Sequence, residues 1–284
     1  MLDVLSSSAI QSILEGSDET KLWDLYNVVE VFADYELQML VLKKLEKIYK
    51  TIGVQEDLRI CKIAGVHLLQ GNYEATMDIY KVVLRHSKKV FGDAHPFTLK
   101  MMNDIGSVYS KQRNTKAALN LYTEVLQQRK AVLGENHPET LETMNNLGIV
   151  NSILGKYEAA IEIFKEALSH QKELLGDNHP STFAMMNNLG HANQDQGNYD
   201  AAIEIFKEVL PQQKALLGDD HPSTLRTMNN LGVVHSQQRN YDAAMKIYET
   251  VLDRRKVVLG ENHPDTLATM KSLKETMKIL WRGA

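Results

Sequence analysis

Residues 137–176 read HPETLETMNNLGIVNSILGKYEAAIEIFKEALSHQKELLG, and this stretch recurs along the chain. The His-Pro pair at its start returns every 42 residues, at His95, His137, His179, His221 and His263. Columns of methionine, glycine and lysine keep the same step. Self-similarity at a fixed period of this size is typical of a solenoid, in which each repeat is one supersecondary unit that stacks on its neighbours.

Each unit contains two segments with helical periodicity. In the unit at 137–178, Leu141, Met144 and Leu147 lie on one face of the first segment, and Ala160 and Phe164 lie in the apolar stripe of the second. The unit is therefore predicted to be a pair of helices.

The ends of these helices carry recognisable signals. Pro138 suits the first position of a helix, where its missing N–H is not needed. Gly155 stands where the turn between the two helices requires a positive φ, and Arg113 and Arg239 occupy that place in other units at a modest strain cost. Pro211 lies inside a predicted second helix, so we expect a kink near residues 207–211.

A family resemblance becomes specific at these positions. The tetratricopeptide motif has the spacing that is seen here for Leu147, Gly148, Gly155, Tyr157, Ala160, Phe164 and Ala167. The 42-residue period and the pattern HPxTLxTMNNLG are similar to the tetratricopeptide arrays of kinesin light chains. The resemblance covers residues 54–281 and implies an all-α fold, a right-handed α-solenoid of antiparallel helix pairs.

The repeat register predicts the organisation of the chain. We expect an irregular N-terminal helical cap at 1–53, five helix-turn-helix repeats over 54–263, and a C-terminal capping helix at 264–284. The repeats are expected at 54–94, 95–136, 137–178, 179–220 and 221–262, and the first of them is degenerate. In the last helix Lys271 and Lys274 give a polar outer face, as terminal repeats require.

Composition narrows the class of function. The net charge of −4 argues against a nucleic-acid-binding surface, which usually shows a basic excess. Cys61 is the one cysteine, which fits a reducing compartment. No apolar run approaches membrane-spanning length, and the N-terminus has no basic region of the secretory type. We therefore expect a cytoplasmic protein without nucleic-acid or membrane partners.

No pattern in the sequence predicts catalysis. There is no HExxH, no paired Cys/His spacing and no GxxxxGK[ST] loop, so we expect no enzyme activity, no cofactor and no metal. The histidine column does not suggest a zinc site, because stacked helices lie about 8–10 Å apart whereas zinc holds its nitrogen ligands at about 2 Å. We expect these histidines to act at helix starts. The lysine column near the end of each second helix is expected to be solvated and to complement the helix dipole.

Asparagines in the middle of each first helix are the main candidates for binding. They form one column, Asn103, Asn145, Asn187 and Asn229, and part of the next, Asn146, Asn188 and Asn230. Asparagine is a weak helix former, so its repetition calls for a reason. Its amide can pair with a peptide unit, and in the related arrays groove asparagines hold peptides in this way. The alternative is that they bond to the neighbouring repeat and only shape the stack.

The columns beside these asparagines vary, as side-chain selection would require. They include Lys100, Lys111, Ile149, Ile153, His191, Arg226 and Val233. Ile149 and Ile153 could receive an apolar anchor, and the basic residues could meet carboxylates. The predicted function is a scaffold, monomeric or weakly dimeric, that binds an extended peptide or partner segment in a concave groove. The alternatives are a self-assembling repeat protein and, with less support, an RNA-binding array.

Overall fold

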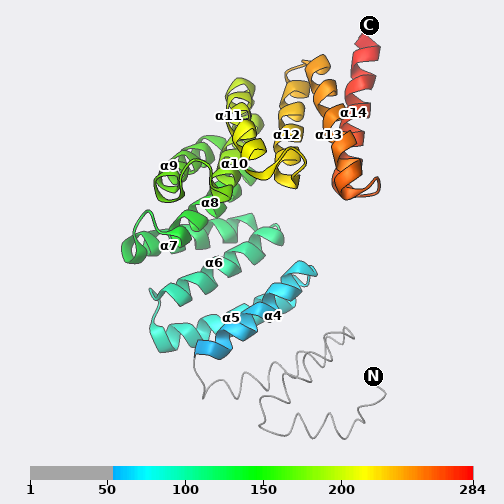
Figure 1. The fold of residues 1–284 in the computed structure, drawn as a ribbon. Coiled ribbons are helices and arrows are strands. Elements are labelled where there is room, and N and C mark those ends of the chain that lie inside the picture. Colours follow the sequence, from blue (N-terminus) through cyan, green and yellow to red (C-terminus); the bar gives the residue numbers. More distant parts are fainter. Residues whose placement is uncertain (1–53, 284) are drawn as a thin grey trace, which may run out of the picture. The chain divides into compact units, whose positions relative to one another are not determined.

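The computed structural model describes residues 54–283, and within that range the chain is entirely α-helical (Figure 1). The helices are α4 (Val54–Leu69), α5 (Tyr73–Phe91), α6 (Pro96–Lys111), α7 (Thr115–Leu133), α8 (Pro138–Ile153), α9 (Tyr157–Leu175), α10 (Pro180–Gln196), α11 (Tyr199–Leu217), α12 (Pro222–Gln237), α13 (Tyr241–Leu259) and α14 (Pro264–Gly283). The predicted N-terminal cap at 1–53 lies outside the described residues.

The chain divides into two compact units between Leu121 and Tyr122, inside α7. In the first unit, α4 packs on α5 and α5 on α6, around a core that includes Ile60, Tyr80 and Met101. In the second unit, each helix from α8 to α14 packs on the next. There α8 also contacts α10, and α12 contacts α14, so the first helices of successive pairs lie side by side. The predicted fold class, an all-α solenoid of helix pairs, is confirmed.

Each first helix begins with a histidine cap. Nδ1 of His95, His137, His179, His221 and His263 accepts a hydrogen bond from the backbone N–H two residues later, at 3.1–3.2 Å. A proline follows at the first helical position. The predicted role of these histidines at helix starts is confirmed.

Removing one such cap is expected to destabilise the fold by about 1 kcal/mol, because an N–H in the first turn of the helix loses its acceptor. His179→Ala tests this, with His179→Asp as the control, since aspartate also caps through an oxygen. The measurement is the midpoint of chemical denaturation followed by circular dichroism. Equal loss in both variants would contradict a capping role.

The loops that lead into the first helices are fixed by a buried threonine. Oγ1 of Thr140, Thr182 and Thr224 donates to the carbonyl oxygen of the glycine six residues earlier, at 2.8–2.9 Å, and all three side chains are fully buried. Each bond joins the end of one second helix to the start of the next first helix. Repeats of this kind therefore keep the same loop geometry.

The turns within the pairs have the predicted conformation. Gly155 has a φ of 73°, and Arg113 and Arg239 take φ values of 61° and 64° in the equivalent places. These two arginines are strained, since a side chain disfavours the left-handed region. At Pro211 the helix α11 continues without a break to Leu217, so a bend there stays a prediction.

Candidate functional site

Two asparagines of the first column lie in the interior. Asn103 and Asn187 are 1% and 4% exposed. Both polar atoms of the Asn187 amide are bonded: Nδ2 donates to the Phe183 carbonyl at 2.8 Å and Oδ1 accepts from Thr227 Oγ1 at 3.0 Å. The expectation that the whole column faces the groove therefore does not hold for these two. Asn187 joins α10 to α12 instead.

The other two asparagines of this column are partly exposed. Oδ1 of Asn145 accepts from Asn188 Nδ2 at 2.7 Å, and Oδ1 of Asn229 accepts from Thr269 Oγ1 at 3.1 Å. Nδ2 of Asn145 and of Asn229 has no hydrogen-bond partner within residues 54–283. The oxygens thus hold neighbouring first helices together, and the amide N–H groups remain available.

The second column is also divided between the two roles. Asn146 is half-buried, Asn188 bonds to Asn145, and Asn230 is 8% exposed, with Nδ2 at 2.9 Å from Nε2 of His191. Burial lowers the pKa of His191, although Asp195 partly opposes this shift. The neutral imidazole, which can accept from the amide of Asn230, is favoured. This contact joins α10 to α12.

The varied residues fall on both units. In the first unit Lys100 forms an ion pair with Asp104 at 2.8 Å, and Lys111 is exposed. In the second unit Ile149, His191 and Val233 are half-buried at equivalent places on α8, α10 and α12, while Ile153 and Arg226 are exposed. The second unit therefore presents apolar and basic groups beside the partly exposed asparagines.

Four lysines of the column, Lys88, Lys130, Lys172 and Lys214, form ion pairs and are not simply solvated. Nζ of Lys130 lies 2.7 Å from Glu166, that of Lys172 lies 3.2 Å from Glu208, and both lysines also meet an acid of the following loop. The bond to Glu166 raises the pKa of Lys130, with burial opposing it. For Lys172, burial lowers the pKa, but Asp177 and Glu208 outweigh burial and the net shift is upward.

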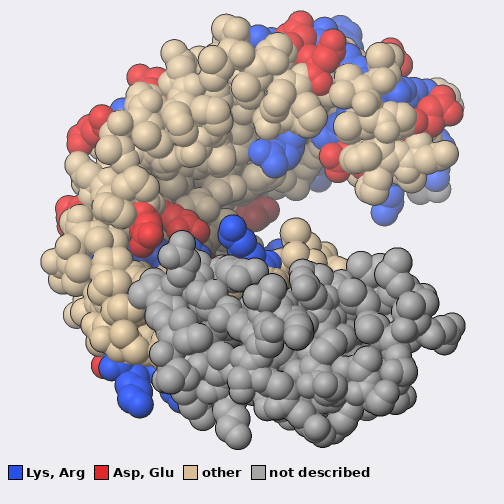
Figure 2. All heavy atoms as spheres, turned by 60° about the horizontal axis from the view of Figure 1, so that its bottom comes forward, with Lys and Arg blue, Asp and Glu red and all other residues tan. Residues whose placement is uncertain are grey.

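The pairs with Glu166 and Glu208 tie α7 to α9 and α9 to α11. Figure 2 shows basic and acidic side chains scattered over the face in view, with broad uncharged areas between them.

Within residues 54–283 no helix is both long and apolar enough to cross a bilayer. The same residues contain no group of three or more His, Cys, Asp or Glu side chains placed to hold a metal ion.

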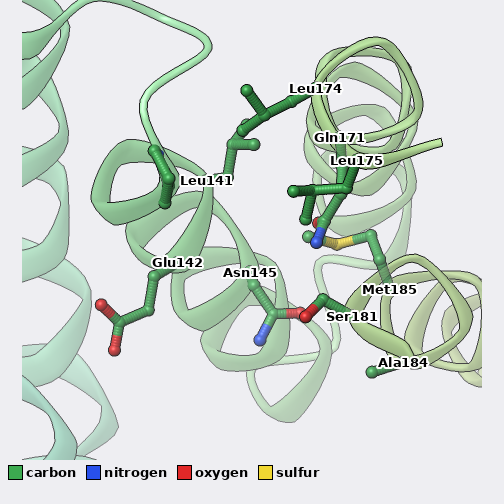
Figure 3. A pocket seen from close by; sticks show the side chains of 10 residues that line it. Leu141, Glu142, Asn145, Gln171, Leu174, Leu175, Ser181, Ala184 and Met185 are labelled. Carbon is green, nitrogen blue, oxygen red and sulfur yellow. The ribbon is translucent and has the colours of Figure 1, made fainter. Parts of the chain in front are cut away.

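A cavity of about 270 Å³ opens between α8, α9 and α10 (Figure 3). Its apolar walls include Leu141, Leu174, Leu175 and Met185, and Gln171 also lines it. At the edge it reaches Glu142, Asn145, Ser181 and Ala184, so it opens beside one of the available amides. This cavity was not predicted from the sequence.

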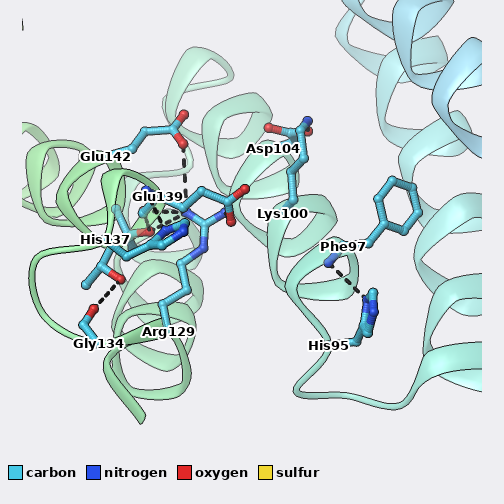
Figure 4. A network of polar contacts seen from close by, with 11 residues as sticks. His95, Phe97, Lys100, Asp104, Arg129, Gly134, His137, Glu139 and Glu142 are labelled. Atoms are coloured by element: carbon cyan, nitrogen blue, oxygen red, sulfur yellow. Dashed lines mark hydrogen bonds and ion pairs between the residues drawn. The ribbon is translucent and has the colours of Figure 1, made fainter. Parts of the chain in front are cut away.

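The short side chain of Gln171 explains part of the origin of this cavity. The equivalent residue of the preceding repeat is Arg129, which is fully buried (Figure 4). Nη1 of Arg129 donates to the Glu139 carbonyl and to Thr143 Oγ1, each at 2.7 Å, and Nη2 lies 3.0 Å from the Glu139 carboxylate. Arg129 therefore fills the space that Gln171, with a shorter side chain, leaves open.

Arginine and an acid vary together in these repeats. Arg255 repeats the pattern of Arg129, with Nη1 at 2.8 Å from the Asp265 carbonyl and 2.7 Å from Thr269 Oγ1. Where the buried residue is Gln171 or Gln213, the residue ten positions later is a serine, Ser181 or Ser223. A buried arginine thus occurs where an acid stands ten positions later, and it is replaced by glutamine where that acid is a serine. This paired variation was a signal in the sequence that could have indicated the contact.

The comparisons with known proteins agree with this architecture. The model of the tetratricopeptide repeat family matches residues 58–131, 112–173, 152–209 and 181–256. Among curated proteins, none matches the chain.

Solved structures show the same fold at low sequence identity. A Podosopora anserina protein described as a kinesin light chain with nearly identical TPR-like repeats is 21% identical, with a TM-score of 0.64 over 72% of this chain and 98% of that one. BtubC (BKLC) from P. vanneervenii is 16% identical, with a TM-score of 0.63 over 90% and 94%. Residues 41 to the end of MamA from Desulfovibrio magneticus RS-1 are 14% identical, with a TM-score of 0.52 over 72% and 98%.

Repeats of this kind generally mediate protein–protein interaction and are generally not enzymes. The family model covers well over half of the chain, and its matches span both structural units. The chain belongs to the tetratricopeptide repeat family.

Proposed function

We propose that this protein is a scaffold that binds an extended peptide, or an unstructured segment of a partner protein, along α8, α10 and α12. The observation that carries the proposal is the pair of partly exposed amides, Asn145 on α8 and Asn229 on α12, each with an Nδ2 group that has no partner in the described part of the chain. An amide N–H group is the donor that a peptide carbonyl requires.

The spacing of these amides sets the length of ligand. First helices lie about 8–10 Å apart, so α8 and α12 are separated by about 16–20 Å. An extended chain advances about 3.3 Å per residue, so about five or six residues span the two amides. Such a segment would pass Ile153, His191 and Arg226, whose differences would provide selectivity.

Only some of the residues predicted to bind support the proposal, and the two amides that carry it lie in the second unit. Asn103 and Asn187 are left out, because burial removes them from contact with a ligand. Lys100 and Lys111 belong to the first unit, so they stay candidates for a separate contact with carboxylates. Asn146, Ile149 and Val233 remain candidates for contacts beside the two amides.

The test begins with peptides selected from a random display library against the 284-residue chain. Asn145→Ala with Asn229→Ala is expected to weaken the selected peptides about tenfold or more, since each hydrogen bond contributes about 0.5–1.5 kcal/mol. The measurement is the Kd by titration calorimetry. The matched control replaces Asn136 and Asn262, two exposed loop asparagines, by alanine.

Thermal unfolding of both double variants shows whether the fold is kept, because the oxygens of Asn145 and Asn229 also join helices. Equal affinity in the groove variant and the control variant would overturn the proposal. A library that yields no peptide would do so as well.

A second candidate, self-association, is favoured by α14. This helix presents Lys271 and Lys274 to solvent as predicted, but it also exposes Leu267, Ile279 and Trp281 by 48%, 49% and 77%. The residue equivalent to Leu267 in the preceding repeat, Leu225, is fully buried. Exposed apolar side chains of this kind are what contact between two copies would use.

A further inference from the structure

The cavity between α8, α9 and α10 has one amide, that of Gln171, directed into it. Gln171 is 6% exposed, and neither its oxygen nor its nitrogen forms a hydrogen bond within the described residues. Figure 3 shows its amide directed into the space between α8 and α10, among Leu141, Leu175 and Met185. The oxygen and nitrogen of this amide are accessible from the cavity, so an occupant that covered them without pairing would leave a buried polar group unsatisfied.

In other repeats some of the positions equivalent to the cavity lining carry larger side chains. In the next repeat Phe183 replaces Leu141 and Arg226 replaces Ala184, so larger side chains stand at two of the lining positions. At the end of the array Arg255 replaces Gln171 and reaches Thr269. Three lining positions, Leu141, Gln171 and Ala184, thus have larger counterparts in at least one other repeat.

The size and lining indicate the class of occupant. A volume of about 270 Å³ is just below the roughly 300–1,000 Å³ of small-molecule pockets, so it suits one large side chain. The walls are mostly apolar, and the amide of Gln171 offers one acceptor and two donors. An aromatic side chain with a polar tip matches this arrangement.

We propose that this cavity holds a tyrosine side chain of the bound partner segment, with its hydroxyl hydrogen-bonded to the amide of Gln171. This proposal rests on the proposed function, because Asn145 lines the same cavity and would hold the backbone of the segment. Tyrosine fits better than tryptophan, since a phenol both donates and accepts whereas an indole only donates. Phenylalanine would leave the buried amide unpaired.

The first experiment uses 4-methylphenol, the side chain of tyrosine, as the probe. The full chain carries 12 methionines, and methyl-labelled methionine would report binding through the NMR signal of Met185, assigned with a Met185→Leu variant. We expect a saturable shift with 4-methylphenol and at least fivefold weaker binding of toluene and of 3-methylindole. Gln171→Leu is expected to remove the preference over toluene.

Two variants that copy the chain's own residues serve as controls. Leu141→Phe introduces the residue found at Phe183, and Ala184→Arg introduces the residue found at Arg226. Both should abolish the shift while leaving the helicity unchanged. The proposal is overturned by the absence of a shift, by binding that survives both filled variants, by equal binding of toluene, or by tighter binding of 3-methylindole.

A second experiment separates this proposal from the proposed function. Peptides selected by the chain should contain tyrosine, and replacing it by phenylalanine should weaken them at least fivefold with the natural chain but not with Gln171→Leu. Peptides that depend on Asn145 and Asn229 but lack such a tyrosine would overturn the cavity assignment and leave the scaffold function standing. Failure to select any peptide would refute both.

Discussion

Arg129→Gln is expected to lower the free energy of unfolding by about 3 kcal/mol, because it removes the partner of Glu139 and two further hydrogen bonds in a buried place. The carboxylate of Glu139 keeps 34% of its side-chain exposure, so water compensates for part of the loss. The measurement is equilibrium denaturation followed by circular dichroism, with the slope compared between variants, since repeat arrays can unfold in parts.

The next repeat provides the matched control for this prediction. Arg129→Gln combined with Glu139→Ser recreates the pair Gln171 and Ser181, so the double variant should recover a substantial part of the loss. Arg129→Lys should stay destabilised, because an ammonium cannot reproduce the forked contacts of a guanidinium. If the double variant were less stable than Arg129→Gln alone, the two positions would not be coupled as we infer.

Gly190→Ala is expected to destabilise the fold by about 2 kcal/mol, although alanine is the better helix former. A Cβ at residue 190 would lie 2.6 Å from Cε1 of Phe206, and this ring is fully buried. The ring could relieve the overlap only by moving against the core. The measurement is the thermal unfolding midpoint by calorimetry.

Gly65 serves as the control for this second prediction. It also lies within a helix, but no atom stands within 4 Å of the place where its Cβ would be, so Gly65→Ala should stabilise the chain by about 0.5–1 kcal/mol. Phe206→Leu in combination with Gly190→Ala should cost less than the sum of the two single changes. A Gly190→Ala chain as stable as the natural one would show that the contact is not tight.

The repeat period made the helices and their caps predictable from sequence. The His-Pro pairs and the turn positions at Gly155 and Arg239 follow from local chemistry, which recurs at each step of the period. Burial of individual asparagines was not predictable in the same way. A helical wheel gives the direction of Asn187 but not the arrival of Thr227 from the next repeat, which covers and bonds it.

The partner of Asn145 and the cavity were not predicted, because both depend on contacts between repeats. Met185 stands where Thr227 and Thr269 stand in later repeats, so Asn145 lacks a threonine partner and bonds to Asn188. The cavity likewise depends on the summed volume of side chains from three helices, which no single column reveals. Column-by-column comparison within the chain would have shown the paired change of arginine and acid.

That paired change makes the repeats unequal as building blocks for recombination. Excision of 179–220 would bring Gln171 before Ser223, which is again a neutral pair. Excision of 137–178 would instead set Arg129 before Ser181, and excision of 221–262 would set Gln213 before Asp265, so either would leave a charge without its counterpart. This array can therefore lengthen or shorten through the repeat 179–220 without breaking a pair, while the junctions at Arg129 and Arg255 depend on the order of their repeats.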